Sequence, residues 1–125
     1  MIKKDLVVLT VDDDIINLKL LKSMLLKNPN VKEVIEAKNG SDGVGVLKTR
    51  YDIDLILLDI IMPVMGGIEM LKIVRADENL RQLPILVLTT DETKKSEAFE
   101  CGANGFLTKP IRNDELIKKI ATVIV

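Results

Sequence analysis

The sequence predicts an α/β fold built around an open parallel sheet. Short apolar runs alternate with helix-like segments along all 125 residues, and no linker or low-complexity stretch interrupts them. The alternation repeats five times. Because strand–helix–strand connections are right-handed in nearly all proteins, the helices should cover both faces of the sheet. The length suits one domain, so we assign residues 1–125 to a single unit.

The first unit starts with the strand-like apolar run Leu6–Val11. Asp14 follows where a helix cap is expected. Apolar residues then recur at helical spacing as far as Leu25, and the segment 28–30 (Asn-Pro-Asn) stops the helix.

The second unit pairs a strand over Val31–Ala37 with a helix that ends near Thr49. A turn that begins at Asn39 joins them. Gly43 and Gly45 lie inside this helix, where each costs about 1 kcal/mol relative to alanine. We therefore expect a short or mobile helix.

The third strand, Leu55–Leu58, is apolar on both faces as a buried parallel strand is, and a helix over residues 68–76 follows it. Pro84 opens the fourth strand, which runs into Thr89. The next helix, residues 93–101, has few apolar residues and ends before Gly102. A helix with so few apolar contacts moves at low cost.

The fifth strand covers residues 105–108, and Asn113 is expected to cap the last helix. The apolar residues of this helix form one stripe: Leu116, Ile117, Ile120, Val123 and Ile124. Five such units in a chain of this length match the flavodoxin-like doubly wound fold, (βα)5, with a parallel five-stranded sheet in the order 2-1-3-4-5.

The composition excludes several functional classes. A net charge of -1 gives no field that would attract nucleic acid or anionic lipid. Aromatic residues are scarce at 2%, which disfavours single-strand nucleic-acid binding and flavin stacking. The chain has no histidine, so histidine-based catalysis and ligation are ruled out. No apolar run approaches the ~18 residues of a membrane span, Cys101 is the single cysteine, and we expect a cytoplasmic protein.

Polar residues suited to phosphoryl chemistry follow four of the strands: Asp12, Asp13, Asp59, Thr89 and Lys109. The carboxyl ends of parallel strands share one edge of the sheet, so these side chains should meet. Converging carboxylates stay ionised only when a cation joins them, and oxygen ligands suit Mg²⁺. Each residue alone has an ordinary explanation: a turn aspartate, a strand threonine or a surface lysine.

Four motifs carry a family resemblance: LTVDDD (9–14), DLILLDIIMPVMGG (54–67), LPILVLTT (83–90) and CGANGFLTKP (101–110). Together, in this order and at these intervals, they resemble bacterial response-regulator receiver domains, of the single-domain chemotaxis-regulator kind. The resemblance covers essentially the full length. It implies a signalling switch, not an enzyme, that takes a phosphoryl group from a sensor histidine kinase or phosphotransfer protein.

The resemblance also implies roles for individual residues. Asp59 would be the phosphoacceptor, and Thr89 and Lys109 would bind the phosphoryl oxygens. Asp13 and Asp59 would bind Mg²⁺ directly, Asp12 through water, and the backbone carbonyl of Ile61 would complete the protein ligands. Thr89 and Phe106 would form the switch.

The implied output face is the one built by residues 93–125. Through it the protein would control a downstream protein or output domain, without contacting nucleic acid or membrane directly; a phosphorylation-dependent homodimer is an alternative use of this face. Departures from the family pattern at Ile61 and Thr90 should hinder attack by water, whereas Asp91 could orient one. We therefore expect autodephosphorylation that is not especially fast.

Three other interpretations remain. A phosphatase with an aspartate nucleophile places a second aspartate two residues later, where this chain has Ile61. A flavodoxin-type electron carrier needs a Ser-, Thr- and Gly-rich loop after the first strand, where this chain has three aspartates. A receiver that no longer accepts phosphate would lack some of the site residues, and this chain has them all.

Overall fold

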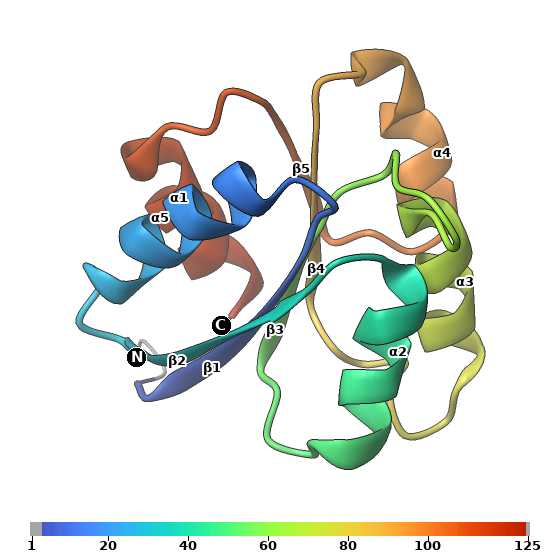
Figure 1. Cartoon of the computed structure of the whole chain (residues 1–125), viewed down its shortest axis with the longest axis horizontal. Coiled ribbons are helices and arrows are strands. Elements are labelled where there is room, and N and C mark those ends of the chain that lie inside the picture. The colour runs from blue at the N-terminus through green and yellow to red at the C-terminus, as the bar shows by residue number, and fades with distance from the viewer. Residues whose placement is uncertain (1–3, 125) are drawn as a thin grey trace.

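A computed structural model describes residues 4–124 and confirms the predicted architecture. Five parallel strands form one sheet in the order β2-β1-β3-β4-β5. Figure 1 shows α1 and α5 on one face of this sheet and α2, α3 and α4 on the other. The elements are β1 Leu6–Val11, α1 Ile15–Leu26, β2 Val31–Ala37, α2 Gly40–Thr49, β3 Leu55–Leu58, α3 Gly67–Ala76, β4 Ile85–Thr89, the 3₁₀ turn η1 Glu92–Lys94, α4 Lys95–Glu100, β5 Gly105–Thr108 and α5 Asn113–Val123.

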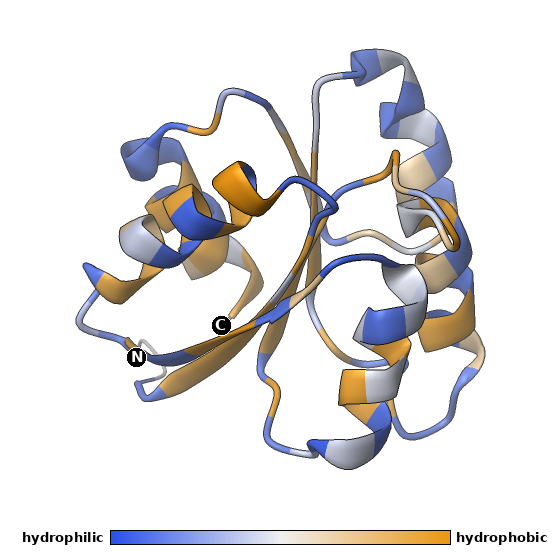
Figure 2. Cartoon of the chain, viewed as in Figure 1, coloured by the Kyte–Doolittle hydropathy of each residue, from blue (hydrophilic) through white to orange (hydrophobic). Residues whose placement is uncertain are grey.

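The sheet separates two hydrophobic cores. Side chains alternate across each strand, so in β1 Leu9 packs in the core beneath α2–α4 and Val8 packs in the core beneath α1 and α5. Every residue of β1, β3 and β4 is buried, and Figure 2 shows the hydrophobic character of these central strands. Within residues 4–124, no helix is long and apolar enough to cross a membrane.

Helix α2 spans ten residues, so the expectation of a short helix was wrong. A Cβ at Gly43 would lie 2.9 Å from Cε of Met70 and 3.2 Å from Cγ2 of Val11. The missing side chain thus lets α2 pack closely against α3 and β1. Gly45 faces open space, and the Asn39 side chain caps α2 by accepting from the backbone N–H of Asp42 at 2.8 Å.

Three expectations about the helices need correction. The predicted helix over 93–101 is the 3₁₀ turn η1 followed by the six-residue α4. Asn113 is the first residue of α5 and does not cap it; Arg112 holds the cap position without a side-chain hydrogen bond. Ile117 departs from the buried stripe and is 42% exposed. Asp14 does cap α1, as expected, because its carboxylate accepts from the N–H of Ile16 at 2.9 Å.

Candidate functional site

The predicted carboxylates meet at the carboxyl edge of the sheet. Asp12 directly follows β1 and is 2% exposed, Asp59 directly follows β3 and is 9% exposed, and Asp13 is exposed. One carboxylate oxygen from each of the three lies within 4.8 Å of the others. The prediction that these aspartates converge is therefore confirmed.

Backbone groups orient the two buried carboxylates. Oδ1 of Asp12 accepts from the N–H of Asp14 at 2.9 Å, and Oδ1 of Asp59 accepts from the N–H of Ile60 at 2.9 Å. In each residue the second oxygen, Oδ2, faces the ammonium of Lys109. The edge therefore presents two fixed oxygens to one cation.

Lys109 joins the carboxylates of two different strands. Its Nζ donates to Oδ2 of Asp12 at 2.7 Å and lies 3.5 Å from Oδ2 of Asp59. Only 13% of the Lys109 side chain is exposed, so solvent screens these charges weakly. Burial raises the pKa of Asp59 above its ordinary value, the charge of Asp12 raises it further, and Lys109 opposes both.

Thr89 and Phe106 lie on the neighbouring strands. Thr89 ends β4 and is buried, and its hydroxyl oxygen accepts from the N–H of Asp91 at 3.3 Å. Phe106 is buried in β5, where it pairs in register with Val87. Both predicted switch residues are therefore buried. Thr89 is the last residue of β4, and Phe106 lies on β5, the strand that Lys109 follows.

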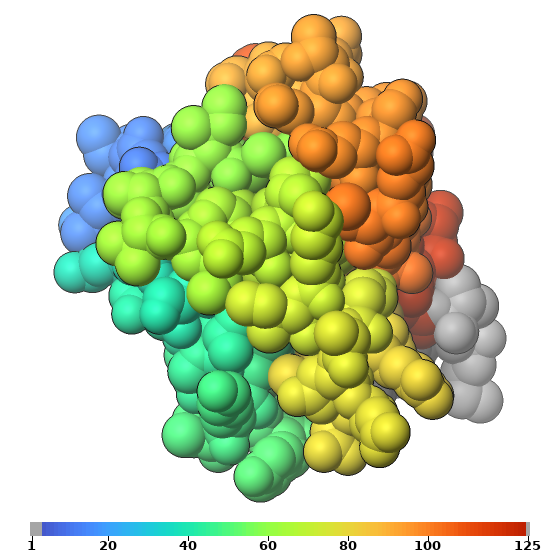
Figure 3. All heavy atoms as spheres, turned by 90° about the vertical axis from the view of Figure 1, so that its right-hand side faces the viewer, coloured from blue at the N-terminus to red at the C-terminus, as the bar shows by residue number. Residues whose placement is uncertain are grey.

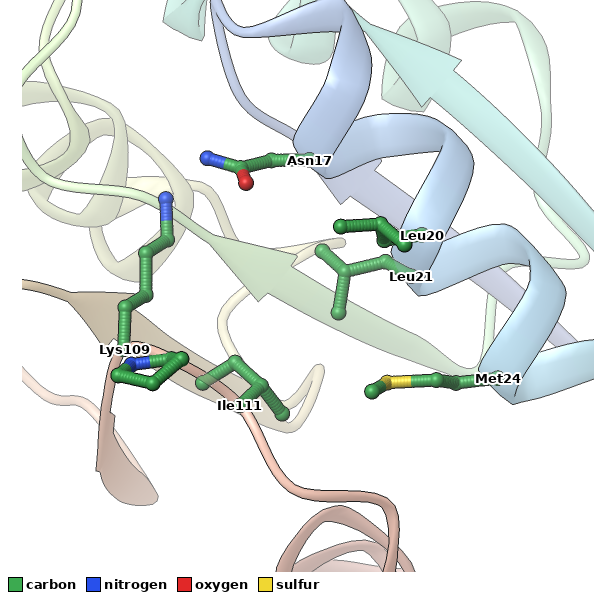
Figure 4. A pocket seen from close by; sticks show the side chains of 7 residues that line it. Asn17, Leu20, Leu21, Met24, Lys109 and Ile111 are labelled. Atoms are coloured by element: carbon green, nitrogen blue, oxygen red, sulfur yellow. The ribbon is translucent and has the colours of Figure 1, made fainter.

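Sequence reasoning missed a groove beside Lys109. Figure 4 shows the side chains of α1 facing the segment 109–111. The groove between them has a volume of about 110 Å³. It is lined by Asn17, Leu20, Leu21, Met24, Lys109, Pro110 and Ile111. The sequence pattern that could have predicted the groove lies in α1, where leucine and isoleucine occupy exposed positions such as Ile16 and Leu20.

The donor set fits a divalent cation. Asp12, Asp13 and Asp59 offer three hard oxygen donors within 4.8 Å of one another, and Mg²⁺ binds through carboxylates together with water and phosphate oxygens. Bound there, Mg²⁺ would supply charge neutralisation for a phosphoryl group.

Comparisons with known proteins agree with this geometry. The chain is 34% identical over 121 residues to the chemotaxis protein CheY-3 of Vibrio cholerae, a match that covers 95% of this chain and 92% of that protein. The high-resolution structure of the chemotaxis response regulator CheY4 of Vibrio cholerae superposes with a TM-score of 0.85 at 34% identity, covering 94% of this chain and 98% of that one.

A third relative bears on the metal. The receiver domain of the sensor histidine kinase PA1611 from Pseudomonas aeruginosa, solved with a magnesium ion in its active-site cleft, has a TM-score of 0.85 at 27% identity and covers 95% of this chain and 97% of its own. The family model for the response regulator receiver domain matches residues 8–121. The chain therefore belongs to the response regulator receiver domain family and is a phosphorylation-activated switch of the two-component systems.

Proposed function

We propose that Asp59 is the residue that accepts the phosphoryl group and that Lys109 and Thr89 hold its oxygens. The observation that carries this proposal is the Lys109 ammonium, which contacts Oδ2 of Asp12 at 2.7 Å and faces Oδ2 of Asp59 at 3.5 Å. A cation already placed between two buried carboxylates can bind an incoming anionic group without large rearrangement. Asp59 is the central carboxylate, because β3 is the middle strand of the sheet.

The chemistry is a direct displacement. A carboxylate oxygen of Asp59 attacks the phosphorus of a phosphohistidine, the P–N bond breaks, and the imidazole leaves with the electron pair. Positioning and charge neutralisation are most of what such a transfer requires. We assign the Mg²⁺ ligands to Asp13 and Asp59 directly, Asp12 through water, and the backbone carbonyl of Ile61.

The protein assists only its own phosphorylation and dephosphorylation. The side chain of Ile61 is exposed and cannot hydrogen-bond a water, and Thr90 is exposed on the loop after β4. Both side chains are expected to hinder an in-line water, so hydrolysis should not be especially fast.

The signal is proposed to leave through the output face, residues 93–125, of which residue 125 lies outside the described part of the chain. Thr89 and Phe106 would link the phosphoryl group to that face, because β4 and β5 are paired along their length. Exposed Phe99 and Ile117 give the face apolar contacts for a downstream protein or output domain, or for a second copy of the chain.

A beryllofluoride titration in the presence of Mg²⁺ tests the phosphoacceptor assignment. We expect saturable binding that perturbs the NMR signals of Asp59, Thr89 and Phe106, because this ion mimics a phosphoryl group on a carboxylate. The substitution Asp59→Ala should abolish the binding. Saturable binding that survives in Asp59→Ala would contradict the assignment.

The donor is proposed to approach over α1. Asp59 is nearly buried, so a phosphohistidine protein that reaches it must also contact the rim of the site, and on the α1 side that rim is the apolar groove beside Lys109. A donor that covers this groove would bury Leu20, which is 57% exposed. Burial of one leucine contributes about 2 kcal/mol.

The substitution Leu20→Ser should therefore slow transfer from a phosphohistidine protein that labels the wild-type chain by at least tenfold. Labelling by phosphoramidate, a small donor that needs no docking surface, should stay unchanged. Leu26→Ser is the matched control, because Leu26 is 49% exposed on the same helix but does not line the groove. Equal rates for the two variants with the protein donor would refute docking at this groove.

A further inference from the structure

The two ends of α4 are held in different ways. At its carboxyl end, the guanidinium of Arg75 in the last turn of α3 donates from Nε to the carbonyl of Gly102 at 2.9 Å and from Nη2 to Oδ1 of Asn104 at 2.8 Å. Its Nη1 donates to the carbonyls of Arg81 and Leu83 at 2.9 and 2.8 Å. One half-buried side chain thus joins the α4–β5 turn to α3 and to the loop before β4.

The α4–β5 turn has further ties to the sheet. Asn104 accepts from the N–H of Ile85 through Oδ1 and donates its own N–H to the carbonyl of Ile85, both at 2.8 Å. Gly102 adopts a φ of +104°, and a Cβ there would lie 2.8 Å from Cγ of Arg75. Figure 3 shows α4 and α3 packed side by side at this surface. The carboxyl end of α4 is therefore fixed to its neighbours.

The amino end of α4 is held much more weakly. The 3₁₀ turn η1 buries no residue, and in α4 the buried residue is Ala98. A hydrogen bond from the hydroxyl of Thr108 to Oε1 of Glu92, at 3.0 Å, ties η1 to β5. Among residues 4–124, no other side-chain hydrogen bond joins the 90–95 segment to that strand. Loss of this contact would leave the amino end tied to the sheet by the bond from the Asp91 N–H to the Thr89 hydroxyl.

This contact lies next to the groups that would respond to a phosphoryl group. Thr108 pairs in register with Thr89 and directly precedes Lys109. The Thr89 hydroxyl accepts from the N–H of Asp91 at 3.3 Å, which is long for a hydrogen bond. A hydroxyl that turns to donate to a phosphoryl oxygen on Asp59 weakens its contact with Asp91. Because Asp91 directly precedes Glu92 in the chain, a movement of Asp91 also shifts Glu92 and so acts on the Thr108–Glu92 contact.

We propose that the Thr108–Glu92 hydrogen bond is a latch that holds the 90–95 segment in its unphosphorylated position, and that Arg75 is a fixed pivot. Phosphorylation releases the amino end of α4, while the carboxyl end stays in place. This inference rests on the proposed role of Asp59 as phosphoacceptor. Because the latch stabilises only the unphosphorylated arrangement, its removal favours the other one and tightens the binding of a phosphoryl mimic.

The substitution Thr108→Val tests the latch, because valine keeps the β-branched shape and removes the hydroxyl. We expect the Mg²⁺-dependent dissociation constant for beryllofluoride to fall about threefold to tenfold, the effect of one lost hydrogen bond. Thr108→Ser keeps the donor and should stay within about twofold of wild type. Thr122→Val is the matched control, since its hydroxyl bonds to the Lys119 carbonyl within α5.

Hydrogen exchange provides the second measurement. In Thr108→Val without beryllofluoride, the amides of 91–95 should exchange as fast as they do in the beryllofluoride complex of wild type, whereas the amides of 103–105 should stay protected in both. An unchanged dissociation constant in Thr108→Val, or equal loss of protection at both ends of α4, would overturn the latch. If wild type itself fails to bind beryllofluoride, the phosphoacceptor assignment fails, and the latch fails with it.

Discussion

Replacing Lys109 with methionine is expected to lower the free energy of unfolding by about 3 kcal/mol at pH 7 in the absence of Mg²⁺. Methionine has nearly the same length and fills the same space, so the loss comes from the charge. Without the ammonium, the carboxylates of Asp12 and Asp59 remain buried beside each other with no cation between them. Urea denaturation followed by circular dichroism measures the change.

Two comparisons identify the cause of this loss. Mg²⁺ should restore part of the stability of Lys109→Met, because a cation at the acidic cluster replaces the missing charge. Lys118→Met, at an exposed position on α5, should change the stability by less than about 0.5 kcal/mol. A Lys109→Met protein as stable as wild type in the absence of Mg²⁺ would mean that the ammonium does not stabilise the two carboxylates.

The same substitution should slow phosphorylation by phosphoramidate about a hundredfold. Lys109 is proposed to donate to the phosphoryl oxygens, and removal of one preorganised donor to a developing anion slows an enzyme by about this factor. The rate is measured under conditions where the variant is fully folded, with Mg²⁺ present. A rate within threefold of wild type would exclude Lys109 from phosphoryl binding.

Sequence reasoning located the site because the site depends on topology. Asp12, Asp59, Thr89 and Lys109 come directly at or after four different strands, and parallel strands place their carboxyl ends at one edge. The alternation of apolar runs was enough to predict those strands and their shared edge. The carboxylates of Asp12 and Asp59 come together because β1 and β3 are neighbours, and the long side chain of Lys109 reaches both from β5, on the far side of β4.

The features that sequence reasoning missed depend on contacts between distant residues. Gly43 looked like a weakness in α2, but its missing side chain makes room for Met70 of α3. A Cβ at Gly67 would lie 2.1 Å from the Asp59 carbonyl oxygen, so this glycine lets α3 start directly beneath the site. The pattern of α3 does not single out Arg75, whose guanidinium fixes the turn after α4. Local patterns carry no information about such pairings.

Replacing Asp59 with asparagine is expected to abolish phosphorylation and, in the absence of Mg²⁺, to raise the free energy of unfolding by about 1 kcal/mol at pH 7. Asparagine matches the shape of aspartate and carries no charge. Burial and the neighbouring Asp12 raise the pKa of Asp59, so the ionised form costs stability in the folded protein. The negative charge that Asp59 needs to accept a phosphoryl group therefore lowers the stability of the fold.

The pH dependence of this gain follows from the raised pKa. Between the ordinary pKa of an aspartate and the raised value in the folded protein, the folded state binds more protons than the unfolded state. The contribution of Asp59 to the free energy of unfolding therefore falls as the pH rises through that interval, and it stays at its lowest value at higher pH. The difference between Asp59→Asn and wild type should be largest at neutral pH and should shrink as the pH falls below the raised pKa.

The pH dependence is taken from the difference in stability between Asp59→Asn and wild type. Other carboxyls have lowered pKa values, so their contributions to stability change with pH in the opposite direction. Arg50 lowers the pKa of Asp52 and Glu33, which lose stabilising interactions as the pH falls. These groups are common to both proteins and cancel in the difference. Asp13→Asn gives a second comparison: Asp13 belongs to the same cluster but is exposed, so its gain should be smaller. A gain from Asp59→Asn that does not vary with pH would show that the charge of Asp59 is not its origin.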